Sequence, residues 1–85
     1  MCDETFEQYL ADVGLQWEQA TLVQKEHAFH EYLNIECGGG FFTEQVEPKS
    51  IKISFDSLRV ITIDTTETLQ SIDAKLNSFL NEVWG

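Results

Sequence analysis

Residues 51–63, IKISFDSLRVITI, decide the fold of this 85-residue chain. Apolar and polar side chains alternate on both sides of Asp56-Ser57, which is typical of two strands joined by a tight turn. With a two-residue loop, Phe55 faces Leu58, and Ile53 faces Val60 across the strands. This register predicts an apolar face of Ile51, Ile53, Phe55, Leu58 and Val60, and an opposite face that carries Lys52, Ser54, Arg59, Ile61 and Ile63.

A hairpin with one apolar face is marginal in water unless another element covers it, and residues 65–84 fit that role. Asp64 with Glu67 three residues later is typical of a helix start. The apolar residues that follow at alternating steps of three and four are Leu69, Ile72, Leu76, Phe79 and Val83. We expect this helix to lie across the sheet. The alternative is a dimer through the same seam, which fewer than three heptads disfavour.

Residues 1–37 form a helical half. Thr5 with Gln8 is typical of a capping box, and Gly14 is a plausible end for the first helix. A second helix is expected from Leu15 or Gln16, although one bent helix through Gly14 remains an alternative.

The glycines of residues 38–40 end this half and are interpreted as a flexible connection. A first strand over residues 41–46 follows, closed by a turn at Pro48-Lys49. The predicted order is ααβββα, a single small α+β domain over residues 1–85 in which a three-stranded antiparallel meander packs on helices. Its parts are an acidic helical half (1–37), the β-meander (41–63) and a C-terminal amphipathic helix (65–84).

The net charge of the chain is −10, from 15 acids and five bases. Residues 1–47 hold ten acids and Lys25 alone, which leaves −9, whereas the remaining five acids and four bases leave −1. A field of this sign repels phosphate backbones and anionic lipid and attracts basic protein surfaces. We therefore expect a basic protein partner, no direct contact with nucleic acid and no membrane association. The alternative is that the acids only keep the protein soluble.

The compartment is expected to be the cytoplasm. The start MCDETFEQYL carries acids where a signal peptide needs a basic region, and no apolar stretch is long enough to span a bilayer. Two cysteines, Cys2 and Cys37, make no disulfide framework, which favours a reducing environment.

Residues with catalytic chemistry do not form a recognisable motif. His27 and His30 share a helical face, but their neighbours do not match either zinc-protease pattern. Cys37 at the negative end of a helix has its thiolate disfavoured. The triglycine follows a helix rather than a strand, so it is not a phosphate-binding loop. We expect no enzymatic activity, no metal and no cofactor, and a metal or thiol enzyme built on these three residues is the least favoured hypothesis.

The favoured hypothesis is a small inhibitor that docks its acidic helices on a basic, nucleic-acid-binding surface and blocks it. Adjacent strand residues point to opposite faces, so Phe41 or Phe42 is expected to be exposed as an apolar anchor. The candidate contacts are Glu4, Glu7, Asp12, Glu18, Glu26, Glu31, Glu36, Phe41 and Phe42.

In size, acidity and lack of catalytic motifs the chain resembles, as a class only, phage anti-defence inhibitors such as anti-CRISPR proteins, and immunity proteins or antitoxins. No residue motif carries this resemblance, so it assigns no site residue. The alternative hypothesis is a non-catalytic accessory or scaffold subunit. On these grounds the expected state is a monomer or a weak homodimer through the C-terminal helix.

Overall fold

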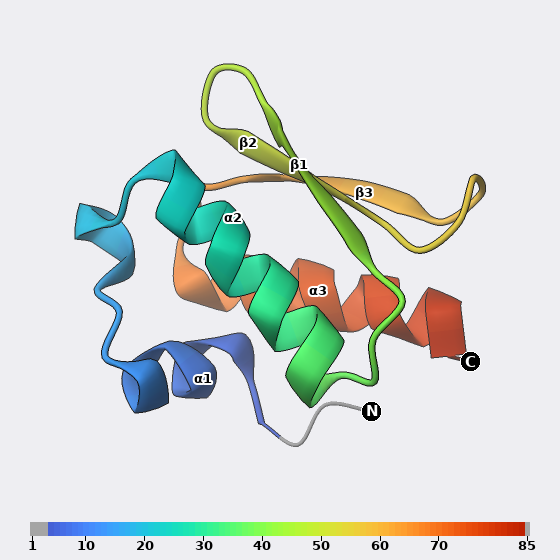
Figure 1. Ribbon diagram of the computed structural model, residues 1–85, viewed down its shortest axis with the longest axis horizontal. Coiled ribbons are helices and arrows are strands. Elements are labelled where there is room, and N and C mark those ends of the chain that lie inside the picture. Colours follow the sequence, from blue (N-terminus) through green and yellow to red (C-terminus); the bar gives the residue numbers. More distant parts are fainter. Residues whose placement is uncertain (1–3, 85) are drawn as a thin grey trace.

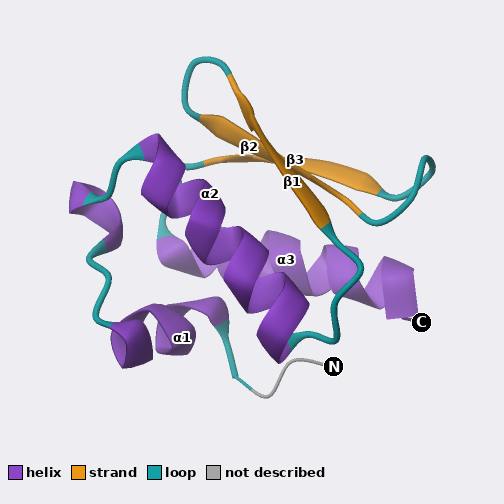
Figure 2. Ribbon diagram, in the orientation of Figure 1, coloured by secondary structure: helices purple, strands orange, loops and turns teal. Residues whose placement is uncertain are grey.

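The structure is a computed structural model that describes residues 4–84. Within these residues three α-helices lie below a three-stranded antiparallel sheet in the view of Figure 1. Figure 2 separates the helical layer from the sheet. The predicted α+β architecture is confirmed. In chain order the elements are α1 (Phe6–Val13), a 3₁₀ turn (Trp17–Gln19), α2 (Leu22–Glu31), a π-helical turn (Tyr32–Glu36), β1 (Phe42–Val46), β2 (Ser50–Ser54), β3 (Val60–Asp64) and α3 (Leu69–Trp84).

Local side-chain caps set where the first two helices begin. The Thr5 hydroxyl accepts from the Gln8 amide and the Gln8 side chain accepts from the Thr5 amide, both at 3.1 Å, as predicted. Gly14 ends α1 with a φ of 77°. The same Thr-x-x-Gln pattern recurs at Thr21 and Gln24, where it starts α2. The expected start at residue 15 or 16 is therefore wrong, because the second capping box lies further along the chain.

The predicted register of the central hairpin is wrong by one residue. Ile53 pairs with Ile61 and Ile51 pairs with Ile63. The Phe55 amide donates to the Arg59 carbonyl at 3.0 Å, so the loop has three residues, 56–58, and not two. A slip of one residue turns a strand over, since side chains alternate between the faces.

The longer loop is held by the Asp56 carboxylate, which accepts from the amides of Leu58 and Arg59, both at 2.9 Å. As a result Ile63 is fully buried, whereas Val60 is exposed and Leu58 is 90% exposed. The correct core face of β3 is the one that the sequence argument assigned to the outside.

The C-terminal helix covers the sheet as expected but begins later than residue 65. The Thr68 hydroxyl accepts from the Ser71 amide at 3.2 Å and so caps α3, which starts at Leu69. Asp64, which the sequence suggested as the cap, instead binds Thr66 in the preceding turn. The apolar seam of α3 packs within the same chain. Its buried residues are Ile72, Leu76, Phe79 and Leu80.

Two aromatic clusters fill the core at either end. Under α1 and α2, the rings of Phe6 and Phe29 stack at 4.7 Å, and Trp17 meets both edge-on at 5.3 Å. At the other end Phe41 contacts the rings of Phe55, Phe79 and Trp84. Burial of this aromatic surface supplies most of the stabilisation that a domain of this size can gain.

The glycine run after α2 adopts a backbone conformation that favours glycine. All three glycines have positive φ angles of 86–98°, which residues with a side chain rarely adopt. Asn34 fixes the exit from the loop, because its side chain accepts from the Phe41 amide at 2.9 Å and donates to the Phe41 carbonyl at 3.2 Å.

Cys37, just before the glycines, is fully buried and disulfide-bonded. The expectation that the cysteines make no disulfide is therefore wrong for Cys37. Cys2, the other cysteine of the chain, lies outside the described residues. Across residues 4–84, none of the helices combines the length and the apolar character needed to cross a bilayer.

Candidate protein-binding surface

Three of the candidate acids on the helical side have free carboxylates. Glu7, Asp12 and Glu18 are exposed, and within residues 4–84 no hydrogen bond or ion pair holds their side chains. Glu7 and Asp12 lie on α1, and Glu18 lies on the 3₁₀ turn that follows it. These charges are not neutralised inside the fold, so they are available to a partner.

Glu26 and Glu31 are placed differently, although the sequence grouped them with the other acids. Glu26 accepts from the Thr43 hydroxyl at 3.0 Å and from the Gln45 amide group at 2.9 Å, which ties α2 to β1. Glu31 lies 2.7 Å from the Nε2 atom of His27, one turn earlier on α2. Glu26 therefore has a structural role, and Glu31 is partly screened by the histidine.

Glu31 joins Glu4 and Glu36 around a pair of tyrosines whose rings lie 5.4 Å apart. Burial raises the pKa of Tyr9, and the nearby charges of Glu31, Glu36 and Glu4 raise it further. Burial, followed by the charges of Asp73, Glu4 and Glu36, raises the pKa of Tyr32 to about 12. The start of α1 and the end of α2 thus form one acidic end of the helical layer.

A groove of about 530 Å³ runs between α1 and α2, and its lining is mainly apolar. Val13 and Val23, on opposite walls, are 55% and 63% exposed. Val13 is the last residue of α1, and Val23 lies in the first turn of α2. The residues that line the groove are Tyr9, Val13, Leu15, Val23, Gln24, His27, Ala28 and Glu31.

A second recess of about 380 Å³ lies between α2 and β1, and it shares Val23 and His27 with the first. Phe42 lines it and is 70% exposed, whereas Phe41 is buried in the core. Of the two phenylalanines only Phe42 is accessible to a partner. The two recesses therefore lie on either side of α2 and adjoin at Val23 and His27.

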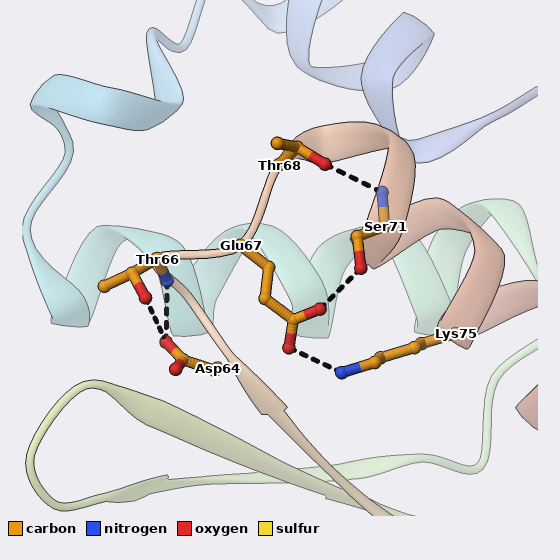
Figure 3. A network of polar contacts seen from close by, with 6 residues as sticks. All are labelled: Asp64, Thr66, Glu67, Thr68, Ser71 and Lys75. Atoms are coloured by element: carbon orange, nitrogen blue, oxygen red, sulfur yellow. Dashed lines mark hydrogen bonds and ion pairs between the residues drawn. The ribbon is translucent and has the colours of Figure 1, made fainter.

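The acids after residue 47 contrast with those on α1. Figure 3 shows Glu67 bound to the Ser71 hydroxyl and to the Lys75 ammonium group, and Asp64 bound to Thr66. Hydrogen bonds from Lys75 and then Ser71 lower the pKa of Glu67, and those from Thr66 lower the pKa of Asp64. These carboxylates hold the turn before α3.

Asp73 of α3 binds the start of α1. Its two carboxylate oxygens accept from the amides of Phe6 at 2.8 Å and Glu7 at 3.1 Å, where the helix has unpaired donors and a positive dipole end. A cap from a residue so distant in the chain leaves no local pattern that would have revealed it.

The groups considered for chemistry do not come together. His30 contacts the Asn34 side chain at 3.1 Å, and His27 pairs with Glu31. In the part of the chain that the structure describes, no three histidine, cysteine or acidic side chains are grouped as metal ligands. Cys37 presents no thiolate because its sulfur is in the disulfide.

A further cavity, of about 680 Å³, lies between the 3₁₀ turn, the β1–β2 turn and the start of α3. It brings together Lys25 and Lys49, but Glu18 and Glu67 line it as well, so its charge is balanced. The Lys25 ammonium group lies over the ring of Trp17, 5.2 Å from its centroid, and so already makes a cation–π contact within the fold.

No protein-family model, no curated protein and no solved structure matches this chain. The case for a function therefore comes from the side chains described above. Two surfaces stand out among them: the free carboxylates on α1 and the 3₁₀ turn, and the adjoining recesses on either side of α2.

Proposed function

We propose that this chain is a small acidic inhibitor that docks the outer side of α1 and α2 on a basic surface of a partner protein and blocks it. The observation that supports this proposal is the unequal use of carboxylates. Glu7, Asp12 and Glu18 on α1 and the 3₁₀ turn are free, whereas the acids after residue 47 are largely bound within the fold.

Charge attraction and apolar contact would both contribute to docking. Carboxylates on helices are held in fixed positions and attract lysine and arginine, which speeds association and sets orientation. Exposed apolar side chains in a recess then supply affinity when water is excluded from them. A surface that binds nucleic acid is the natural target, because it presents basic side chains in the spacing of a phosphate row.

Occupation of such a surface would inhibit the partner without any chemistry by this chain. This is the mode expected of inhibitors of the anti-defence or of the immunity and antitoxin kind. Disulfides persist mainly in oxidising compartments, so the disulfide of Cys37 removes the cysteine argument for the cytoplasm. The proposal is independent of the compartment in which the partner is met.

The rival hypothesis of a scaffold that dimerises through α3 has no supporting observation. The residues of its seam, Ile72, Leu76 and Phe79, are buried against the rest of the chain. A dimer through this face would require α3 to leave the core.

The test compares two double charge reversals that change the net charge equally, from −10 to −6. Asp12→Lys with Glu18→Lys alters the proposed docking side. Glu47→Lys with Glu82→Lys is the matched control, because both carboxylates are exposed and have no partner among the described residues. Each tagged protein is used to capture proteins from lysate at about 0.1 M and 0.5 M salt, with quantitative mass spectrometry.

We expect wild type and the control to retain the same basic protein in a salt-sensitive manner, and the Asp12/Glu18 variant to retain at least about tenfold less. The retained protein should also lose nucleic-acid binding when the wild-type chain is added. Equal loss in both variants would show that only net charge matters. No loss in either would show that the acids of α1 and the 3₁₀ turn are not the interface.

A further inference from the structure

The geometry of the α1–α2 groove points to its occupant: we infer that it receives the apolar face of a basic amphipathic helix of the partner. This inference rests on the proposed function and names the kind of element that the partner supplies. It is carried by three features, which are the apolar lining, the adjoining recesses on either side of α2 and the sign of the charges around the groove.

The lining favours apolar side chains over a polar ligand. Val13 and Val23 are more than half exposed on facing walls, and Leu15 and Ala28 also line the groove. Two exposed valines on neighbouring helices are costly unless something covers them, because the surface between them is removed from water only on binding. A helix that lays an apolar stripe into such a groove is a recurring mode of recognition.

The shape favours an elongated occupant. Val23 and His27 line both the α1–α2 groove and the recess between α2 and β1, so the two recesses adjoin at these side chains, and Phe42 lines the second. Phe42 is 70% exposed and offers a further apolar contact at that end. A small molecule would fill one of the two recesses, whereas a helix can contact both.

The charge around the groove selects a basic occupant. Glu31 lines the groove. Tyr9 lines it as well, and the charges of Glu4 and Glu36 help to raise the pKa of this tyrosine. Among the described residues no lysine or arginine lines the groove, and its one histidine, His27, is paired with Glu31. Lysine and arginine on a bound helix can bury their aliphatic stems beside the valines and reach these carboxylates with their charged ends.

The same charges argue against a second copy of this chain as the occupant. A protein of net charge −10 repels its own copies at moderate salt. The apolar stripe of its longest helix, α3, is moreover buried within the fold. The complementary surface is therefore one of opposite charge.

The probes are two synthetic peptides of about 16 residues, long enough to form a helix when bound. Both contain the same leucines and lysines. In one peptide the leucines recur at helical spacing, and in the other the order is scrambled so that no apolar face forms. Binding of each peptide to the full chain is measured by calorimetry at about 0.15 M salt, and amide shifts are followed by NMR.

The variant pair separates the groove from apolar exposure in general. Val13→Ser with Val23→Ser removes the two valines of the groove. Ile35→Ser with Leu58→Ser is the matched control, since these residues are also exposed but do not line the groove. Thermal unfolding of both variants confirms that each is folded before binding is measured.

We expect the amphipathic peptide to bind wild type at least about tenfold more tightly than the scrambled peptide, with the largest amide shifts at Val13, Val23 and His27. The groove variant should lose most of this preference, and the control variant should keep it. That combination supports the inference, because the two peptides carry the same charge and differ only in pattern.

Three outcomes would overturn it. Equal binding of the two peptides, or none, would mean that the groove does not select an amphipathic helix. A preference that survives in the groove variant would place the helix elsewhere. A dimer in sedimentation of the protein alone, abolished by the groove variant, would make a second copy the occupant. In each case the capture experiment with the charge reversals still decides the proposed function by itself.

Discussion

The carboxylates on α1 and the 3₁₀ turn and those after residue 47 belong to the same residue types but differ in their contacts. Among the described residues after residue 47, every acid except Glu82 is bound to a group of the protein. On α1 and the 3₁₀ turn, Glu7, Asp12 and Glu18 bind nothing. After residue 47 acids hold turns and caps, whereas those on α1 and the 3₁₀ turn are left for contacts outside the chain.

This difference shows why net charge alone is a weak guide to function. Ten acids in residues 1–47 made the whole first half a candidate surface. The structure removes Glu26, which links α2 to β1, and leaves a smaller set of free acids on α1 and the 3₁₀ turn. Substitutions of buried residues in the second half should therefore have the largest effect on stability.

The largest effect is expected on β3. Ile63 is fully buried, so Ile63→Ala should lower the free energy of unfolding by about 2–5 kcal/mol through lost burial and the cavity left behind. Val60→Ala, on the exposed face of the same strand, should cost less than about 1 kcal/mol. Urea unfolding of both variants checks the register. A larger loss at Val60 would restore the two-residue loop and the opposite core face.

A smaller effect is expected at Asp73, the acid that joins the two halves. Asp73→Ala leaves the amides of Phe6 and Glu7 without their acceptor at the start of α1, and it should cost about 1–2 kcal/mol. Asp12→Ala, at a free carboxylate on the same helix, should change the free energy of unfolding by less than about 0.5 kcal/mol. A similar loss in the free energy of unfolding for the two variants would mean that bound and free carboxylates contribute equally to stability.

Patterns confined to a few residues were predicted well. Thr5 and Gln8 gave the start of α1, Gly14 gave its end, and the spacing of the apolar residues from Leu69 to Val83 gave the helix that covers the sheet. The second capping box, at Thr21 and Gln24, has the same pattern as the first and was available in the sequence. The start of α2 could therefore have been predicted from its local pattern alone.

Features that depend on distant contacts or on one loop residue were not predicted. The hairpin register changes with the length of its loop, and the Asp56 side chain that fixes this length also fits a shorter turn. Asp64 followed by Glu67 looks like a helix cap, but its carboxylate binds Thr66 instead. For the candidate site, the acids were predicted but the groove was not, because the groove exists only where α1 packs beside α2.

A test within the first half concerns Tyr32, whose hydroxyl donates to the Glu4 carbonyl at 2.6 Å. Tyr32→Phe should cost about 1 kcal/mol at neutral pH, as for a typical hydrogen bond. The pKa of Tyr32 is raised from 10.0 to about 12, so the folded state holds the phenol proton more tightly than the unfolded state. This contribution is present below pH 10 and is lost as the pH rises through about 12.

The difference in stability between wild type and Tyr32→Phe should therefore shrink as the pH rises from 9 to 12, followed by urea unfolding. Lysine deprotonation affects both proteins alike, so the comparison isolates the tyrosine. A constant difference would mean that neither burial nor the charges of Asp73, Glu4 and Glu36 oppose ionisation of Tyr32. The tyrosine pKa would then no longer support the description of this end of the groove as acidic.

The smallest effect is expected for the polar network before α3. Hydrogen bonds from Lys75 and Ser71 lower the pKa of Glu67 below 4.5, so the unfolded state binds its proton more readily. The resulting stabilisation is present above pH 4.5 and is lost as the pH falls through the folded-state pKa. Thermal unfolding of Glu67→Gln should thus show a lower Tm than wild type at pH 7, and this deficit in Tm should disappear in acid.

The control is Glu82→Gln, because Glu82 is the one described acid after residue 47 without a partner. This variant should show no deficit in Tm at either pH. A deficit at Glu82 equal to that at Glu67 would mean that the bound acids stabilise the fold only through general charge, and the contrast between the two halves would lose its physical basis.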